Sequence, residues 1–438
     1  MQRYVHYLIA ALAVIVIAAS FGGVRLPRVQ ADAPVRVIGP HGEPIVVQLP
    51  ELAKISPLDL AAACDVLARP DAREARDEHP VALAGCTGEH DKDYAFYDDL
   101  GDMLTEFAEA SAFDANQMIA AMREALVLAP AAEDVSVTLR GLAARATSLV
   151  DRLHAPDYYL LGAEVMAAHL QFCTGEKAAA CRRDTHEDRG LHLSGAGRWR
   201  GDADLLRAGI AAYREALKDA PEKSSNWVDL LTHVGSALGQ LSERTDDTRV
   251  RRTLLREALQ EYLRASGAVN QDERSTWAMI NQNVCSIRQP LAALDQNRYG
   301  SREAIAECEK ARAYYEERGE KTNEAAAHYN MARAYERLAE WDRDETSAMQ
   351  AVAHVRRAVA LYGEDNATMS QAFGRIHLAE ALMDAGDLAR NRRDGDERHK
   401  ALFAEASASL DAAEPILRKA QADGYLERLD SARRRAGR

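Results

Sequence analysis

Apolar side chains recur every three or four residues along most of this chain, which is the spacing of a helix that buries one face. After residue 57 the pattern predicts helices almost throughout, and from residue 202 onward it predicts helical hairpins only. The upstream helices are expected at 97–111, 114–129, 134–153 and 157–172. We therefore expect an all-α fold.

Three segments depart from this pattern. Residues 35–50 contain two β-prone runs around a Gly-Pro-His-Gly turn, which predicts a short β-hairpin. In the region 32–96 a helix is expected after the hairpin, and a polar, proline-containing stretch follows at 69–96. Residues 173–201 are rich in glycine and lack an apolar face, so both stretches are predicted to be loops.

A repeated helix pattern occupies the carboxyl-terminal half. The segments that align are AGIAAYREAL (208–217), EALQEYLRAS (257–266), EAIAECEKAR (303–312) and QAVAHVRRAV (350–359), with a looser match in EASASLDAAE (405–414). Each has a small residue, an apolar residue four positions later and an alanine three further on, so these positions share one helical face. They are Gly209, Ala258, Ala304, Ala351 and Ala406, then Tyr213, Tyr262, Cys308, Val355 and Leu410, then Ala216, Ala265, Ala311, Ala358 and Ala413. Small side chains on this face let a neighbouring helix approach closely.

A second helix lies between these segments and repeats in register with them. Its copies are HVGSALGQL (233–241), NVCSIRQPL (283–291), NMARAYERL (330–338) and HLAEALMDA (377–385). In each copy an aliphatic residue precedes a small one, and the small residues are Gly235, Cys285, Ala332 and Ala379. The copies are 50, 47 and 47 residues apart, against 49, 46 and 47 for the other track. Two tracks with one period indicate a repeated pair of helices over 202–422.

This region resembles the tetratricopeptide repeat family, whose unit is a pair of antiparallel helices, A and B. The segment HYNMARAY, ending at Tyr335, looks like the family's helix A, and Gly209, Tyr213, Ala216 and Pro221 match its helix B. The family unit has about 34 residues, whereas these repeats run 46 to 55, and we expect the additional residues between helix A and helix B. Charged runs at 242–252 and 389–400 would belong to those loops. The resemblance implies an α-solenoid of stacked helix pairs.

The repeat pattern extends in both directions. AAMREALVLAP (120–130) matches AAYREALKDAP (211–221) at eight of eleven positions, so we expect divergent helical repeats over 97–172. Residues 423–438 are basic and polar, and they predict a closing helix of the kind that caps such arrays.

The helix-A surface of such an array is where a partner would bind. By resemblance to the family, an asparagine just before the aliphatic residue contacts the backbone of a bound peptide, and arginines one and two turns on would bind carboxylates. The candidate peptide-binding residues are Thr232, His233, Gln282, Asn283, Tyr329, Asn330, Arg333, Arg337 and His377. They could equally be solvated residues or make hydrogen bonds between repeats.

The amino terminus predicts export. Residues 4–24 carry no charge and follow a short basic start, which is the layout of a signal peptide, with small residues at a cleavage site near Ala31. The uncharged stretch is also long enough to remain as an anchor in an inner membrane. We expect residues 1–31 to be a signal or an anchor, and the chain to be periplasmic or otherwise in the cell envelope.

Six cysteines are compatible with such a compartment. An oxidising environment could pair them as neighbours in sequence, although buried free thiols explain them equally well. The possible disulfide residues are Cys64, Cys86, Cys173, Cys181, Cys285 and Cys308.

Composition narrows the classes of function. The chain has 47% hydrophobic and 28% charged residues, which is a globular balance, and 13 prolines among 438 residues favour helix. A net charge of -13 disfavours non-specific binding to nucleic acid or to anionic membrane surfaces.

Catalytic and metal motifs are not found in the sequence. His79, Cys86, His90, Asp91 and Asp93 can bind metals by type, but their spacing matches no known site. The same holds for His186, Glu187, Asp188 and His192, because HEDRGLH is not HExxH. We therefore expect no catalytic residues, no metal and no cofactor.

The sequence thus favours a non-enzymatic scaffold that binds a peptide or helix of another protein. The alternative is a hydrolase or metal-dependent enzyme with its site in 35–200 and the repeats as a docking platform.

Overall fold

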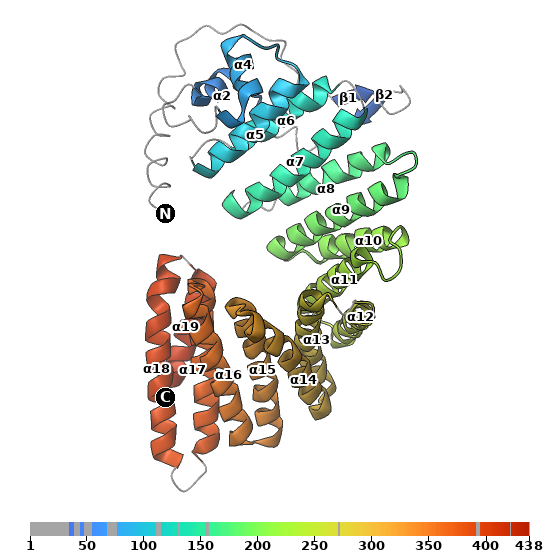
Figure 1. Cartoon of the computed structure of the whole chain (residues 1–438). Coiled ribbons are helices and arrows are strands. Elements are labelled where there is room, and N and C mark those ends of the chain that lie inside the picture. Colours follow the sequence, from blue (N-terminus) through green and yellow to red (C-terminus); the bar gives the residue numbers. More distant parts are fainter. Residues whose placement is uncertain are drawn as a thin grey trace. The chain divides into compact units, whose positions relative to one another are not determined.

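A computed structural model describes most of the chain as helices (Figure 1). The described residues are 35–38, 44–47, 55–67, 77–110, 115–129, 132–153, 157–269, 272–390, 395–420 and 422–437. The predicted signal or anchor at 4–24 lies outside them. Within them, no helix combines the length and the apolar character that a membrane span requires. The chain forms two units, unit 1 (Met1–Ala220) and unit 2 (Pro221–Arg438).

Unit 1 contains a pair of strands and a series of helices. Strand β1 (Val35–Ile38) pairs antiparallel with β2 (Pro44–Val47), and Val35 lies opposite Val47. These are the runs from which a hairpin is expected, and the residues that connect them are not among those described. The helices are α2 (Leu60–Leu67), α4 (Pro80–Thr87), α5 (Tyr94–Ala110), α6 (Ala115–Leu128), α7 (Ala132–Leu153), α8 (Asp157–His169), the short 3-10 helix η3 (Leu170–Phe172), α9 (Ala178–Arg200) and α10 (Ala203–Lys218).

The loop predicted at 173–201 is wrong, because most of it forms the helix α9. Its buried residues are mostly glycine, alanine, threonine and histidine, with Leu193 the one large aliphatic side chain among them, so no apolar periodicity marks the helix. A methyl group placed on Gly190 would lie 2.5 Å from the ring of Tyr213 in α10, which shows how closely the two helices approach. Arg182 at the start of α9 also forms two 3.0 Å hydrogen bonds with Asp219, just after α10. The pair α9 and α10 is thus the helix hairpin that contains Gly209 and Tyr213.

The loop predicted at 69–96 is wrong in part, because it includes α4 and the beginning of α5. Helix α4 begins at Pro80, and the carboxylate of Asp99 accepts a 2.7 Å hydrogen bond from the backbone N–H of Ala82. A proline in the first turn and an acidic cap supplied from another helix stabilise this start. Because Asp99 is distant in sequence, local patterns do not show the cap.

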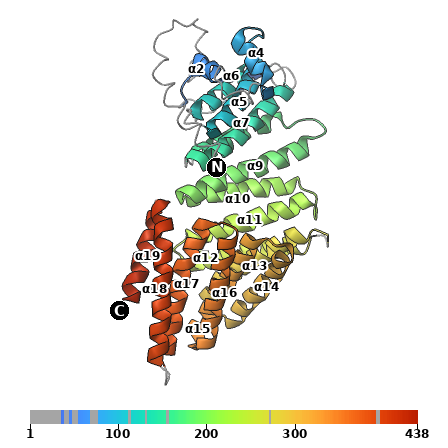
Figure 2. The ribbon, with the colours of Figure 1, turned by 60° about the vertical axis from the view of Figure 1, so that its left-hand side comes forward.

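Unit 2 is a stack of antiparallel helices in which each helix contacts the next (Figures 1 and 2). The first helices of the successive pairs also lie against one another, as the contacts of α13 with α11 and α15 show. The helices are α11 (Ser225–Glu243), α12 (Thr248–Ser266), α13 (Arg274–Asp295), α14 (Arg298–Arg318), α15 (Lys321–Asp342), α16 (Glu345–Glu364), α17 (Thr368–Ala389), α18 (Gly395–Lys419) and α19 (Asp423–Ala436). The expectation of a solenoid-like helical stack is confirmed.

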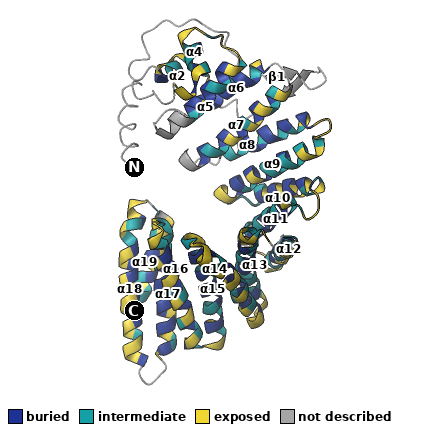
Figure 3. Cartoon of the chain, viewed as in Figure 1, coloured by how far each residue is buried: buried dark blue, intermediate teal, exposed yellow. Residues whose placement is uncertain are grey.

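The recurring small residues of unit 2 lie where its helices meet. Each is buried, and they include Ala258, Ala265, Ala304, Ala311, Ala332, Ala351, Ala358 and Ala379. Gly235 of α11 faces the ring of Tyr262 so closely that a methyl group there would lie 2.9 Å from a ring carbon. In Figure 3 single helices of unit 2 carry both buried and exposed residues, as amphipathic helices do.

The additional length of the repeats lies in the helices, so the prediction of long A-to-B loops is wrong. Only Arg343 and Asp344 separate α15 from α16. Arg343 adopts φ 49°, and the carboxylate of Asp344 accepts hydrogen bonds from the N–H groups of Thr346 and Ser347. A left-handed residue followed by an N-cap reverses the chain with no further residues. The described parts of the charged runs at 242–252 and 389–400 therefore lie largely in helix ends.

Candidate functional site

A polar pocket of about 330 Å³ opens between α15, α17 and α19 of unit 2. Tyr329, Arg333 and Glu336 are spaced four and three residues apart on α15, so they share one face of that helix. The lining is completed by His377, Glu380 and Asp384 of α17 and Arg428 of α19. The pocket is therefore lined by one face of α15, one face of α17 and a single arginine of α19.

One cross-helix pair holds α15 against α17. Nε2 of His377 lies 2.7 Å from a carboxylate oxygen of Glu336, and His377 is only 5% exposed. The ring of Tyr329 packs on the imidazole, with 4.5 Å between ring centroids, and burial raises the pKa of Tyr329. This close approach of a buried imidazole to a carboxylate brings α15 and α17 together at the pocket.

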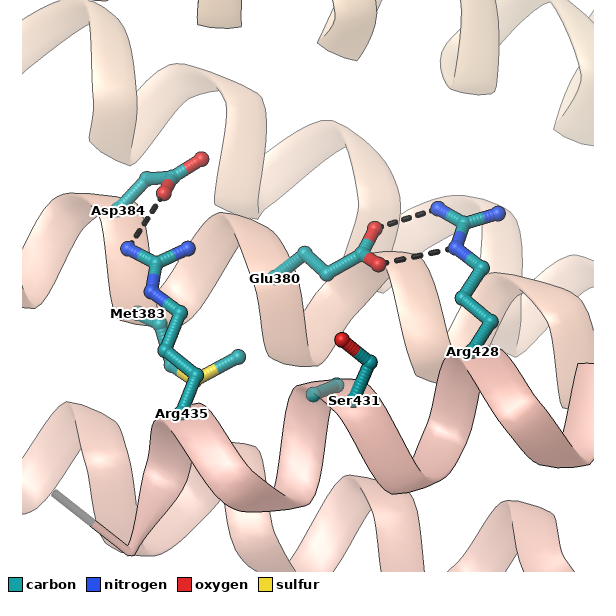
Figure 4. A pocket seen from close by; sticks show the side chains of 7 residues that line it. Glu380, Met383, Asp384, Arg428, Ser431 and Arg435 are labelled. Atoms are coloured by element: carbon teal, nitrogen blue, oxygen red, sulfur yellow. Dashed lines mark hydrogen bonds and ion pairs between the residues drawn. The ribbon is translucent and has the colours of Figure 1, made fainter.

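Helix α19 is held on α17 by two further arginine contacts (Figure 4). Arg428 binds Glu380 through two hydrogen bonds, and the bond from Nε is 2.9 Å long. This bonding with Glu380 raises the pKa of Arg428. Arg435 lies 2.7 Å from Asp384 and 2.6 Å from Asp387. Burial raises the pKa of Asp384, and Arg435 opposes that rise. A second pocket of about 330 Å³ lies between these pairs, lined also by Met383 and Ser431.

Arg333 differs from the other cations of the pocket. It is exposed at the edge, and the described residues supply no ion pair to it. Asn330, one helical turn away on α15, is half-buried, and its side chain makes no hydrogen bond within the described part of the chain. An exposed guanidinium beside a free amide can bind a carboxylate and a peptide group of another molecule.

The structure brings together some of the predicted binding residues. Tyr329, Arg333 and His377 line the pocket, although His377 is buried and paired instead of exposed. Arg337 forms an ion pair with Glu340 of its own helix. Thr232 is buried, and its hydroxyl donates a 2.9 Å hydrogen bond to the carbonyl of Val228 in its own helix.

The other predicted residues belong to neighbouring helices. His233 lies on α11, and Gln282 and Asn283 lie on α13; all three are half-buried and none lines the pocket. They extend the same series of helices but form no site with Arg333.

Sequence reasoning missed Glu336, Glu380, Asp384 and Arg428. Their signal was present in the spacing, because Glu380, Asp384 and Asp387 form an acidic row along one face of α17. Arg428 and Arg435 are seven residues apart, and they form a matching basic row on α19. Nothing local in the sequence states that these two helices are neighbours.

The suspected metal residues of unit 1 do not assemble into one cluster. His79 lies 2.9 Å from Asp99, and His90 lies 3.2 Å from Asp93 at the surface. On α9, His192 lies 2.7 Å from the hydroxyl of Thr147 and 2.7 Å from a backbone carbonyl.

Among the described residues, one group of at least three side chains brings metal-ligating atoms within 4.8 Å of one another, and it consists of His169, Cys173 and Cys181.

All six cysteines form disulfides between neighbours in sequence, which confirms that pairing over buried free thiols. The bonds are Cys64–Cys86, Cys173–Cys181 and Cys285–Cys308, with Cα atoms 5.4, 5.3 and 5.4 Å apart. The first joins α2 to α4, and the last joins α13 to α14 within one repeat.

Comparison with known proteins identifies no relatives by sequence, since no family model and no curated protein matches the chain. Solved structures that align with it include a circular tandem repeat protein with a novel repeat topology (14% identity, 86% of this chain and 93% of that chain, TM-score 0.27). A second is the Naa15/Naa10 complex bound to HypK-THB (15% identity, 86% of this chain and 70% of that chain, TM-score 0.17). A third is a human IFIT1 dimer with PPP-AAAA (11% identity, 83% of this chain and 96% of that chain, TM-score 0.19). At these TM-scores the alignments carry no functional information, and the assignment to helical repeats rests on the helix stack itself.

Proposed function

We propose that this chain is a non-enzymatic interaction scaffold that binds a peptide or helix of a partner protein on the first helices of the unit 2 pairs. The observation that carries the proposal is the polar pocket between α15, α17 and α19, where no described residue forms an ion pair with the exposed Arg333. Most other charged side chains of the pocket form ion pairs within the protein, whereas the guanidinium of Arg333 can bind a charged group of a ligand.

The chemistry of this surface favours an extended segment that carries a carboxylate. Arg333 would bind the carboxylate, Asn330 would bind a peptide group, and Tyr329 would offer a ring edge beside them. The repeats would be of the tetratricopeptide type, lengthened within their helices. Residues 4–24 would direct the chain to the cell envelope, and the three disulfides support an oxidising compartment.

The experiment compares two arginines of one helix. Full-length chain would capture partners from a cell-envelope extract, and the captured proteins would be identified and then titrated singly. Arg333→Ala should weaken binding about tenfold or more, since a hydrogen bond to a charged group contributes roughly 1.5 to 3 kcal/mol. Arg337→Ala is the matched control, because Arg337 pairs with Glu340 on the same helix.

Circular dichroism would establish that both variants keep the helical content of the wild type. Equal binding by the two variants would place the partner elsewhere and overturn the proposal.

A further inference from the structure

One of the three disulfides lies beside a buried histidine. Cys173 follows η3 and Cys181 belongs to the first turn of α9, so their bond joins the end of α8 to the next helix. His169 is one helical turn before Cys173, and only 2% of it is exposed. A nitrogen of its ring and the two sulfur atoms all lie within 4.8 Å of one another.

Hydroxyl groups orient the imidazole toward the sulfur atoms. Nδ1 of His169 lies 2.8 Å from the hydroxyl of Thr185, and Nε2 lies 2.6 Å from the hydroxyl of Ser136. The hydroxyl of Thr185 is also 3.6 Å from the sulfur of Cys173. Nδ1 is therefore the nitrogen on the sulfur side, and Ser136 holds the far side of the ring, as the second shell of a metal site commonly does.

Among the residues that the structure describes, the other two disulfides have no such neighbour. Cys285 and Cys308 are buried against the apolar side chains of Ala304, Met331 and Ala334, none of which is an imidazole, a thiol or a carboxylate. Cys64–Cys86 belongs to no group of three ligating side chains within the described part of the chain. The histidine thus distinguishes Cys173–Cys181 chemically.

We propose that reduction of Cys173–Cys181 creates a zinc site formed by the two cysteine sulfurs and Nδ1 of His169. A dithiol reductant supplies two electrons and two protons, becomes a disulfide itself and leaves two cysteine thiols. Zinc then displaces both thiol protons to water and binds two thiolates and one neutral imidazole. A water molecule or the hydroxyl of Thr185 takes the fourth position.

The geometry and the charge both permit this change. The Cα atoms of Cys173 and Cys181 are 5.3 Å apart, so side-chain rotation can separate the sulfurs without moving the helices. Zinc is bound by thiolate and imidazole ligands at about 2.0 to 2.3 Å, usually in a tetrahedron. Two thiolates cancel the charge of the zinc ion, which lowers the cost of placing it in a buried site. Zinc would then keep α8 joined to α9 after the disulfide is lost.

The experiment uses cobalt as a spectroscopic probe for zinc. Full-length protein, reduced with a phosphine that is then removed under nitrogen, would be titrated with Co²⁺. We expect one equivalent to give thiolate-to-cobalt charge transfer and the visible bands of a tetrahedral ion, and Zn²⁺ to abolish them. Oxidised protein should give neither signal. Absence of the bands in reduced wild type would overturn the proposal.

Matched variants assign the signal to these residues. His169→Gln should weaken cobalt binding at least tenfold, and Cys173→Ser with Cys181→Ser should abolish it. His192→Gln is the control histidine, because it too is buried and bonded to a hydroxyl. Cys285→Ser with Cys308→Ser should leave the spectrum unchanged. A spectrum that survives in the Cys173 and Cys181 double variant contradicts the assignment. If a variant fails to fold, the comparison of oxidised with reduced wild type still decides the matter.

Discussion

The helix pair α9 and α10 of unit 1 and the pair α11 and α12 of unit 2 use the same contact. In each, a glycine of the first helix accepts the ring of a tyrosine from the second, Gly190 with Tyr213 and Gly235 with Tyr262. Yet the sequence pattern predicts α11 as a helix and predicts a loop where α9 lies. The same glycine–tyrosine contact can therefore occur in two helices whose patterns of apolar residues differ greatly.

The difference lies in what surrounds the glycine. In α11 the neighbouring buried positions are Val234 and Leu238, which make an apolar face that periodicity detects. In α9 the buried positions include Thr185 and His192, whose polar atoms are satisfied by hydrogen bonds to other helices and to the backbone. In α9, glycines that let the neighbouring helix approach closely and buried polar groups with hydrogen-bond partners therefore take the place of an apolar face.

The glycine contacts give the largest expected effect. Gly190→Val and Gly235→Val should each destabilise the unit that contains them by about 3 kcal/mol, since an added side chain forces a tightly packed pair apart. Urea unfolding followed by circular dichroism measures the loss.

Gly424→Ala is the control, because a methyl group there meets no atom within 4 Å. If Gly190→Val unfolds at the wild-type urea concentration, α9 does not pack as described, whereas the same result for Gly235→Val questions only unit 2.

The sequence predicts those helices whose buried face shows a regular pattern of small or apolar residues. The alanine repeat of unit 2 predicts its helix pairs, because Ala258, Ala304 and Ala351 recur with nearly the same period as the small residues of the neighbouring helices. The sequence also predicts Arg333 on the face that we propose for binding. It does not predict the pocket, since Arg428 reaches Glu380 from 48 positions away and only the stacking of α19 on α17 brings them together.

Unit 2 also buries a polar contact, and this one makes its stability depend on pH. His328 of α15 and His354 of α16 face each other with their Nδ1 atoms 2.8 Å apart. Glu309 and Arg312 of α14, Glu324 of α15 and Arg357 of α16 lie around them. Burial lowers the pKa of His328 to about 4, and burial also lowers the pKa of His354.

The sign follows from which state binds the proton. Well above pH 6.5 both imidazoles are neutral in the folded and unfolded chain, so they add no pH dependence. Between pH 6.5 and 4 the unfolded chain takes up protons that the folded chain does not, and unit 2 should lose on the order of 2 kcal/mol. His328→Asn with His354→Asn should flatten the urea midpoint over this range. Parallel curves for wild type and variant would contradict the prediction.

The short turn between α15 and α16 gives a smaller effect. Asp344→Ala should cost about 1 kcal/mol, because it removes the acceptor for the N–H groups of Thr346 and Ser347. Asp342→Ala is a nearby control, since Asp342 ends α15 and caps no helix start. Thermal unfolding compares the two. A larger loss from Asp342→Ala would mean that the ion pair of Asp342 with Arg298 matters more than the turn.

The smallest expected effect separates an ion pair between helices from one within a helix. Arg428→Gln should loosen α19 by roughly 0.5 to 1 kcal/mol, because Arg428 joins α19 to Glu380 of α17 through a half-exposed, two-bond contact. Arg337→Gln breaks the ion pair with Glu340 inside α15, which should change stability by a few tenths of a kcal/mol. Hydrogen exchange of the α19 amides detects the first change and should not respond to the second. Raising the salt concentration should shrink the difference, because both pairs are reached by solvent. Equal exchange in the two variants would show that apolar contacts such as that of Leu429, and not the arginine, hold α19 in place.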